Sequence, residues 1–77
     1  MKIYLEWIGL LHIQGTKNHS FVKLKNNATI SSLYDQIKIK KEHQKFISCF
    51  VNGTEMKMFS NLKDGDKVRL FLPTGGG

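Results

Sequence analysis

A single cysteine, Cys49, in a chain of 77 residues is the feature that most constrains the fold. One cysteine makes no internal disulfide, so one compact hydrophobic core must stabilise the chain in place of a disulfide scaffold. A domain of this length buries only about 60% of its unfolded surface, which leaves room for one small domain and excludes a two-domain enzyme. The apolar content of 40% is ordinary for a globular chain, so we expect the chain to fold.

The N-terminal segment, residues 1–13, is apolar enough to resemble a signal peptide. Glu6 interrupts its apolar run, however, and no small-residue cleavage site follows. No stretch approaches the roughly 20 apolar residues that span a bilayer. A free cysteine also suits a reducing compartment. The sequence therefore predicts a cytoplasmic protein with no membrane partner.

Alternating hydropathy predicts strands at both ends of the chain. Residues 68–72, VRLFL, alternate cleanly and follow a tight turn, KDGD, at residues 63–66. The same pattern predicts a strand over residues 2–8. Weaker signals predict strands over residues 21–25 and 46–51, the latter closed by the hairpin dipeptide Asn52-Gly53. A short strand or irregular segment follows near residues 56–59.

Helical spacing appears once, behind the candidate N-cap residue Ser31. The residues that recur at this spacing are Ile30, Leu33, Tyr34 and Ile37. We expect one short amphipathic helix over residues 31–38, with the basic run at residues 38–41 lying where that helix ends.

The element order ββαβ(β)β predicts an α+β fold, a mixed sheet of four or five strands with one helix packed across one face. That arrangement lets a small chain bury its apolar residues together. The expected core comprises Ile3, Leu5, Val22, Leu24, Leu33, Ile37, Val68 and Leu70.

Residue types that carry chemistry are scattered. His12, His19 and His43 lie in different elements, without the ligand spacing of a zinc site, so we expect no metal. Cys49 alternates with its neighbours in a strand and is expected to be a buried core residue. Asp64 and Asp66 flank a turn glycine, where carboxylates accept hydrogen bonds from backbone N–H groups. An independent enzyme is therefore not expected.

The C-terminal segment gives the most specific signal. Residues 62–77, LKDGDKVRLFLPTGGG, combine a leucine, a Gly-Asp turn, a last strand, a proline and a glycine end. Together with the Val51-Asn52-Gly53 hairpin and the Ala28-Thr29-Ile30 lead into the helix, this order resembles the MoaD/ThiS family of ubiquitin-like sulfur carrier proteins. The resemblance covers almost the whole chain and implies a ubiquitin-like β-grasp domain at residues 1–73, with a flexible glycine tail at residues 74–77.

The resemblance also implies a chemistry for the tail. A ubiquitin-activating-type adenylating enzyme would use ATP and magnesium to adenylate the carboxylate of Gly77, and a sulfurtransferase or cysteine desulfurase would supply the sulfur. The resulting thiocarboxylate would donate sulfur to molybdopterin or thiamine synthesis, with the chain acting as the small subunit of a synthase complex. The chain would bind no cofactor itself. Gly76 has no side chain, which lets the tail enter a narrow active site.

The resemblance places the first and last strands side by side at the centre of the sheet. Tyr4 and Ile8 would then share the helix-free face with Arg69 and Phe71. An exposed aromatic cluster beside the tail is a candidate docking site for the partner enzyme. The family's docking position in the last strand matches Phe71.

Two other functions remain open. The first is a ubiquitin-like modifier, conjugated to target lysines through Gly77. The second, favoured least, is a basic nucleic-acid-binding module, since the net charge of +6 attracts polyanions.

Overall fold

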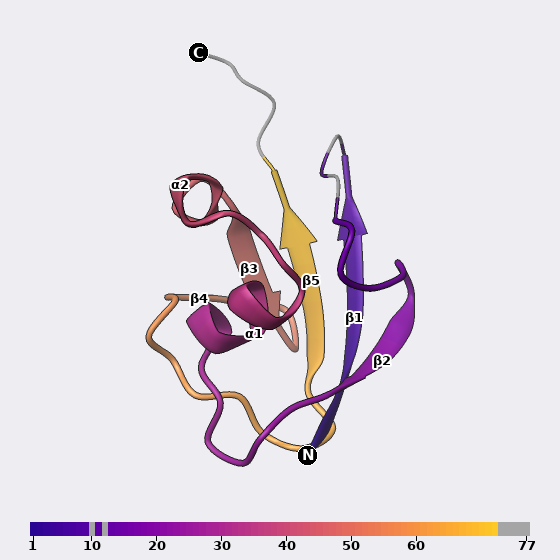
Figure 1. Cartoon of the computed structure of the whole chain (residues 1–77). Coiled ribbons are helices and arrows are strands. Elements are labelled where there is room, and N and C mark those ends of the chain that lie inside the picture. The colour runs from indigo at the N-terminus through magenta and orange to yellow at the C-terminus, as the bar shows by residue number, and fades with distance from the viewer. Residues whose placement is uncertain (10, 12, 73–77) are drawn as a thin grey trace.

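β5 lies at the centre of a five-stranded mixed sheet, in the order β2-β1-β5-β3-β4. The computed structural model describes residues 1–9, 11 and 13–72 (Figure 1). Within them the elements are β1 (Lys2–Ile8), β2 (Ser20–Lys23), α1 (Ile30–Gln36), α2 (Lys41–Gln44), β3 (Ser48–Val51), β4 (Thr54–Met56) and β5 (Lys67–Phe71). β1 pairs with β5 in parallel, and the other neighbouring strands are antiparallel. The predicted α+β fold is confirmed.

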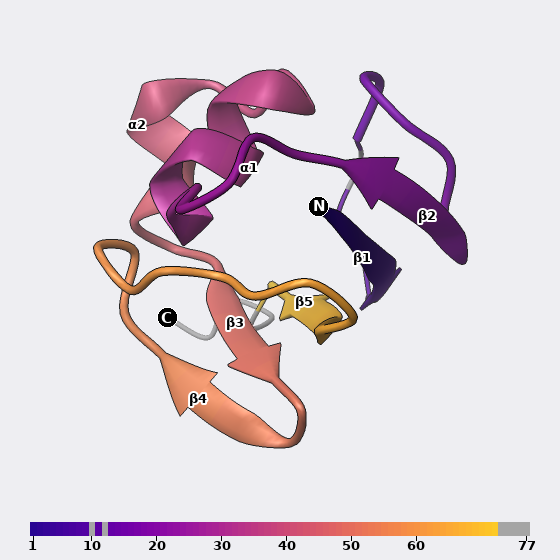
Figure 2. The same ribbon diagram turned by 90° about the horizontal axis from the view of Figure 1, so that it is seen from below.

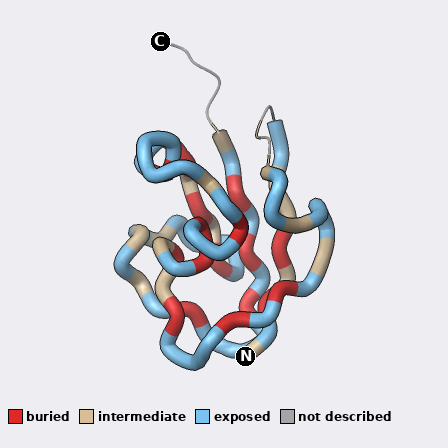
Figure 3. The backbone as a smooth tube through the Cα atoms, in the orientation of Figure 1, coloured by how far each residue is buried: buried red, intermediate tan, exposed pale blue. Residues whose placement is uncertain are grey.

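Both helices lie on one side of the sheet, which leaves the other face uncovered (Figure 2). Every residue of the expected core is buried (Figure 3), and buried residues alternate with more exposed ones along β1 and β5. The core also includes Ile30, Tyr34, Ile47, Cys49 and Leu62. The residues that alternate with the buried ones therefore face away from the helices.

Helix α1 begins one residue earlier than expected because Thr29, and not Ser31, is its N-cap. The Thr29 hydroxyl accepts a hydrogen bond from the Ser32 N–H at 3.1 Å, and the Ser32 hydroxyl accepts one from the Thr29 N–H at 3.2 Å. These two bonds form a capping box that satisfies backbone donors at the helix start. Ser31 lies inside the helix, so its prediction as the cap was wrong.

A second helix, α2, was not predicted, and the basic run at residues 38–41 leads into it. Gln44 is buried, and its Nε2 donates to Oδ1 of Asp35 at 2.8 Å and to the Ile39 carbonyl at 2.9 Å. Lys41 forms an ion pair with Asp35 at 3.1 Å. The bond from Gln44, followed by that from Lys41, holds the pKa of Asp35 below its ordinary range.

The observed strand boundaries differ from the expected ones where a local backbone hydrogen bond takes the place of strand pairing. β3 begins at Ser48, two residues later than predicted, because the Phe46 N–H donates to the His43 carbonyl and finishes the turn of α2. Asn52 and Gly53 turn the β3–β4 hairpin with φ of 51° and 88°, as the dipeptide predicted. Gly15 lies against the C-terminal end of α1, where an added Cβ would meet the carbonyl oxygen of the C-cap residue Ile37 at 2.4 Å.

Candidate functional site

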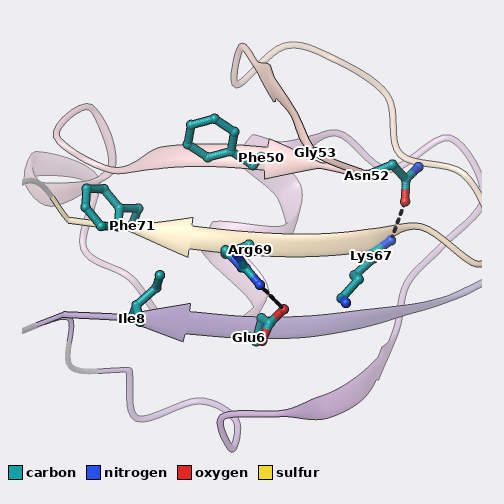
Figure 4. Close-up of a pocket in the computed structure, with 8 residues that line it drawn as sticks. All are labelled: Glu6, Ile8, Phe50, Asn52, Gly53, Lys67, Arg69 and Phe71. Atoms are coloured by element: carbon teal, nitrogen blue, oxygen red, sulfur yellow. Dashed lines mark hydrogen bonds and ion pairs between the residues drawn. The ribbon is translucent and has the colours of Figure 1, made fainter.

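Two rows of side chains cross the helix-free face beside the end of β5. Ile8 of β1 and Ser48 of β3 are the cross-strand partners of Phe71, and Glu6 and Phe50 are those of Arg69. Alternate residues of a strand share a face, so all of these side chains point away from the helices. The close-up shows Glu6 and Ile8 on β1, Arg69 and Phe71 on β5, and Phe50 on β3 (Figure 4).

The apolar members of these rows are exposed. Ile8 is 48% exposed and Phe71 is 40% exposed, although both are large and hydrophobic. Phe50 is half-buried and lies diagonally across from Phe71, a spacing within reach of aromatic side chains. We call Ile8, Phe50 and Phe71 the apolar cluster. Clustered exposed hydrophobic residues are typical of a protein-binding surface.

The cluster lines one end of a shallow groove of about 680 Å³ along β5. The groove is bordered by Glu6, Ile8, Phe50, Asn52, Gly53, Lys67, Arg69 and Phe71 (Figure 4). An open groove with apolar and charged walls fits a protein surface better than a small enclosed substrate.

Arg69 is held in place by Glu6. Its Nη2 donates to Oε1 of Glu6 at 3.2 Å, and the Glu6 side chain is only 14% exposed. The second carboxylate oxygen of Glu6 lies 3.5 Å from Nδ1 of His19. The pair orients the guanidinium beside the apolar cluster, where its remaining N–H groups are available to a partner.

The structure brings together three of the four side chains expected to dock a partner. Phe71, Ile8 and Arg69 are neighbours, whereas Tyr4 lies four residues before Ile8, about 13 Å along β1. Tyr4 contacts other groups: its ring packs edge-on against Phe21 with the centroids 5.2 Å apart. Its hydroxyl lies 3.4 Å from Nδ1 of His19.

Sequence reasoning missed Phe50 and Glu6 as members of this site. The signal for Phe50 was available, since it alternates with buried Cys49 and must therefore lie on the opposite face. The role of Glu6 depends on the register that places it opposite Arg69, and alternation does not supply a register.

The expected reactive residues, Gly76 and Gly77, and the proposed tail at residues 74–77 lie outside the described residues. In the sequence, Gly77 follows Phe71 by six residues. Six residues span at most about 22 Å, so the Cα atoms of Phe71 and Gly77 are no farther apart than that.

The remaining candidates for chemistry have structural roles. Oδ1 of Asp64 accepts the Lys2 N–H at 2.8 Å, and Oδ2 of Asp66 accepts the Lys63 N–H at 2.8 Å. Cys49 is buried, and burial raises the pKa of its thiol to about 12. Within residues 1–9, 11 and 13–72, no three His, Cys, Asp or Glu side chains lie together where they could hold a metal ion. Neither helix in this part of the chain is long and apolar enough to cross a membrane.

The ThiS family model matches residues 12–77, which is most of the chain. This protein belongs to the ThiS family. Its membership confirms the resemblance to the MoaD/ThiS group of ubiquitin-like sulfur carriers on which the sequence prediction rested. The family match runs through Gly77, and therefore includes the segment that the structure does not describe. A comparison with curated protein sequences gives no match.

Solved structures agree with the β-grasp fold of this ThiS-family chain. The crystal structure of SAMP1 from Haloferax volcanii has a TM-score of 0.77 at 17% identity, with 100% of both chains covered. A structure of H. volcanii small archaeal modifier protein 1 has a TM-score of 0.73 at 16% identity, covering 95% of this chain and 98% of the other. A chain from the complex of subunits 1 and 2 of molybdopterin-converting factor from Helicobacter pylori 26695 has a TM-score of 0.64 at 20% identity, with 100% of both chains covered. These similarities establish a ubiquitin-like fold.

Proposed function

We propose that this protein is a sulfur carrier whose Gly77 carboxylate is activated by a partner adenylating enzyme and converted to a thiocarboxylate. In the first step, a carboxylate oxygen attacks the α-phosphorus of ATP and pyrophosphate leaves, giving an acyl-adenylate. In the second, the terminal sulfur of a persulfide on a sulfurtransferase or a cysteine desulfurase attacks the acyl-adenylate and displaces AMP, and a free thiol then reduces the resulting acyl disulfide and releases the thiocarboxylate. ATP and magnesium belong to the partner enzyme, and this chain is its substrate.

The two steps match the chemistry of the group involved. A carboxylate resists nucleophilic attack because its oxygen is a poor leaving group, and adenylation replaces that oxygen with AMP. The product carries a soft sulfur nucleophile at the end of a glycine segment. Since the chain supplies no catalytic side chain of its own in this scheme, it acts as a carrier and not as an enzyme.

The apolar cluster beside the end of β5 is the observation that carries the proposal. A partner that adenylates Gly77 must hold the chain close to that residue. Phe71, an exposed member of the apolar cluster, precedes Gly77 by only six residues in the sequence. Buried apolar anchors surrounded by polar residues contribute most of the affinity of protein interfaces. We assign Phe71 the role of anchor and Arg69, oriented by Glu6, the role of polar contact.

The test is reconstitution with the cognate adenylating enzyme, ATP, magnesium and sulfide, read by intact-mass spectrometry. The proposal expects one oxygen of the chain to be replaced by one sulfur, and expects deletion of Gly77 to abolish the change. The deletion should leave the thermal unfolding midpoint nearly unchanged, because the core is built from residues 3–70. A deletion variant that is still adenylated would overturn the proposal.

A second candidate function is that of a ubiquitin-like modifier. It is favoured by the similarity to the H. volcanii small archaeal modifier protein 1 structure across 95% of this chain. A modifier would form an isopeptide bond between Gly77 and a target lysine. Lysine-linked conjugates in the reconstituted reaction, found by peptide mass spectrometry without sulfur incorporation, would favour the modifier over the carrier.

We propose a synthase subunit as the final acceptor, of the molybdopterin or the thiamine type. The structural similarity to a chain from a two-subunit molybdopterin-converting factor complex supports such a partner. Incubating the thiocarboxylated chain with each candidate synthase and measuring sulfur transfer to its substrate distinguishes the two pathways. The use of ATP and of a free thiol pool is consistent with the cytoplasm, where we place the reaction.

A further inference from the structure

Three lysines gather on the helix-free face at the end away from the apolar cluster. Lys2 of β1 is the direct cross-strand partner of Lys23 of β2, and Lys67 of β5 is the partner of Tyr4. Like charges directly opposite each other destabilise a sheet unless an anion lies between them. Among residues 1–9, 11 and 13–72, the ion pairs involve Lys41, Arg69 and His19, and none of these three lysines. The sheet therefore presents uncompensated positive charge here.

Aromatic rings are interleaved with these lysines. Phe21 is 66% exposed, and its ring packs edge-on against Tyr4 at an angle of 69°. Nζ of Lys2 lies 5.1 Å from the centroid of the Phe21 ring. We call Lys2, Tyr4, Phe21, Lys23 and Lys67 the basic aromatic patch. The Glu6–Arg69 ion pair separates it from the apolar cluster.

Two carboxylates border the patch, and one of them, that of Glu6, is paired with Arg69. Oδ1 of Asp64 accepts the Lys2 N–H at 2.8 Å, which places a negative charge at the edge of the sheet beside Lys2. The three lysines outnumber it, and the whole chain carries a net charge of +6. The patch is thus positive as a unit, and it contributes to a charge that the carrier function does not require.

We propose that the basic aromatic patch binds single-stranded nucleic acid. The lysines would contact successive phosphates, and a base would stack on the exposed ring of Phe21. The carboxylates of an acidic protein segment would pair with the lysines but would not stack on the exposed part of the Phe21 ring. A duplex would keep its bases stacked inside and out of reach of the ring. The combination of charge and an exposed ring on a sheet therefore favours a single strand over both.

The binding experiment uses the full chain and a fluorescein-labelled single-stranded oligouridylate of about 12 nucleotides, with fluorescence anisotropy measured over a range of salt concentrations. With about three phosphates contacted, the logarithm of the association constant should fall with the logarithm of the salt concentration at a slope of about −2. Absence of binding at low salt would overturn the proposal.

Three variants and one matched control separate the effect of the patch from the effect of net charge. Replacement of Lys2, Lys23 and Lys67 together by Gln should abolish most of the salt dependence, whereas replacement of Lys40, Lys45 and Lys57 by Gln removes equal charge elsewhere and should cost much less. The Phe21→Leu variant should bind the oligouridylate about fivefold more weakly or worse, since base stacking is lost. Asp64→Asn keeps the acceptor for the Lys2 N–H and should strengthen binding.

Three further results test whether the patch binds single-stranded nucleic acid. Equal losses in the two lysine variants would overturn the proposal in favour of general charge attraction. A labelled oligoglutamate that binds as tightly as the oligouridylate, with no effect of Phe21→Leu, would overturn it in favour of an acidic protein partner. Deletion of Gly77 should leave oligouridylate binding unchanged, so failure of this proposal and failure of the carrier function are distinguishable.

Discussion

The side chains of Asn52 and Asp66 join the two turns that flank the centre of the sheet. Nδ2 of Asn52 donates to Oδ1 of Asp66 at 2.9 Å, while Oδ2 of Asp66 accepts the Lys63 N–H at 2.8 Å. Oδ1 of Asn52 in turn accepts the Lys67 N–H at 2.9 Å. The hairpin turn after β3 and the Gly-Asp turn before β5 are therefore one hydrogen-bonded unit, and Asp66 is buried within it.

We expect Asp66→Ala to lower the free energy of unfolding by about 1–3 kcal/mol, because it leaves the Asn52 amide and the Lys63 N–H without an acceptor. Asp66→Asn should cost less, since one oxygen remains. Asp64→Ala is the matched control: its carboxylate is exposed and accepts one backbone N–H, so its loss should be smaller. Urea unfolding measures all three, and equal losses for Asp64→Ala and Asp66→Ala would contradict the coupling of the turns.

The capping box at the start of α1 gives a second prediction. Thr29→Ala should destabilise the chain by about 1 kcal/mol, the usual cost of losing an N-cap side chain. Ser31→Ala should change stability by less than about half of that, because Ser31 lies within the helix and caps nothing. Thermal unfolding of the two variants side by side provides the measurement. A larger loss of stability for Ser31→Ala than for Thr29→Ala would show that Ser31 caps the helix, as the sequence alone suggested.

Burial of the Cys49 thiol makes the stability of the folded chain fall with rising pH in the alkaline range. Its thiol ionises near 9 when unfolded, and burial raises its pKa to about 12 in the folded chain. Between these values the folded state binds more protons than the unfolded state, so this contribution to stability is complete below pH 9 and is lost as pH rises toward 12. We expect the unfolding free energy of the wild type to fall between pH 9 and 11 more steeply than that of Cys49→Ala, by up to about 1.4 kcal/mol per pH unit. Equal slopes of the unfolding free energy against pH for the wild type and Cys49→Ala would show that folding does not raise the pKa of the thiol.

Phe71 gives the prediction that bears on docking. Phe71→Ala should weaken association with the adenylating enzyme at least about tenfold, because it removes the anchor of the apolar cluster. Phe59→Ala is the control, since Phe59 is 78% exposed and does not border the groove along β5. Isothermal titration calorimetry with the adenylating enzyme compares them. Unchanged binding of the Phe71→Ala variant would remove this residue from the interface.

Hydropathy alternation was sufficient to predict which face each residue of the central strands occupies. It placed Leu70 in the core and Phe71 on the open face without any knowledge of the strand order. It did not supply the register, and the register decides that Ile8 lies opposite Phe71 while Tyr4 lies beside Phe21. The four expected docking residues therefore shared a face as predicted, but they divide between two surfaces.

Helix α2 shows why another part of the fold could not be predicted. It has only four residues, too few for a helical period to be visible in the sequence. It is held by the bonds of buried Gln44 to Asp35 and to the Ile39 carbonyl, which exist only after the chain has folded. Phe46 follows α2 and is exposed, although the sequence predicted this residue in a strand. Its N–H donates to the His43 carbonyl and finishes the turn of α2, so it does not join β3.

Because β1 pairs in parallel with β5, the surface beside the end of β5 exists only in the folded molecule. Glu6 and Arg69 are 63 residues apart in sequence, so their ion pair and the adjoining apolar cluster form only after nearly the whole chain has come together. An unfolded molecule carries the same glycine segment but no cluster. A partner that must bind Phe71 before it acts on Gly77 would thus activate folded molecules and not unfolded ones. The docking step would then select folded chains without a separate factor.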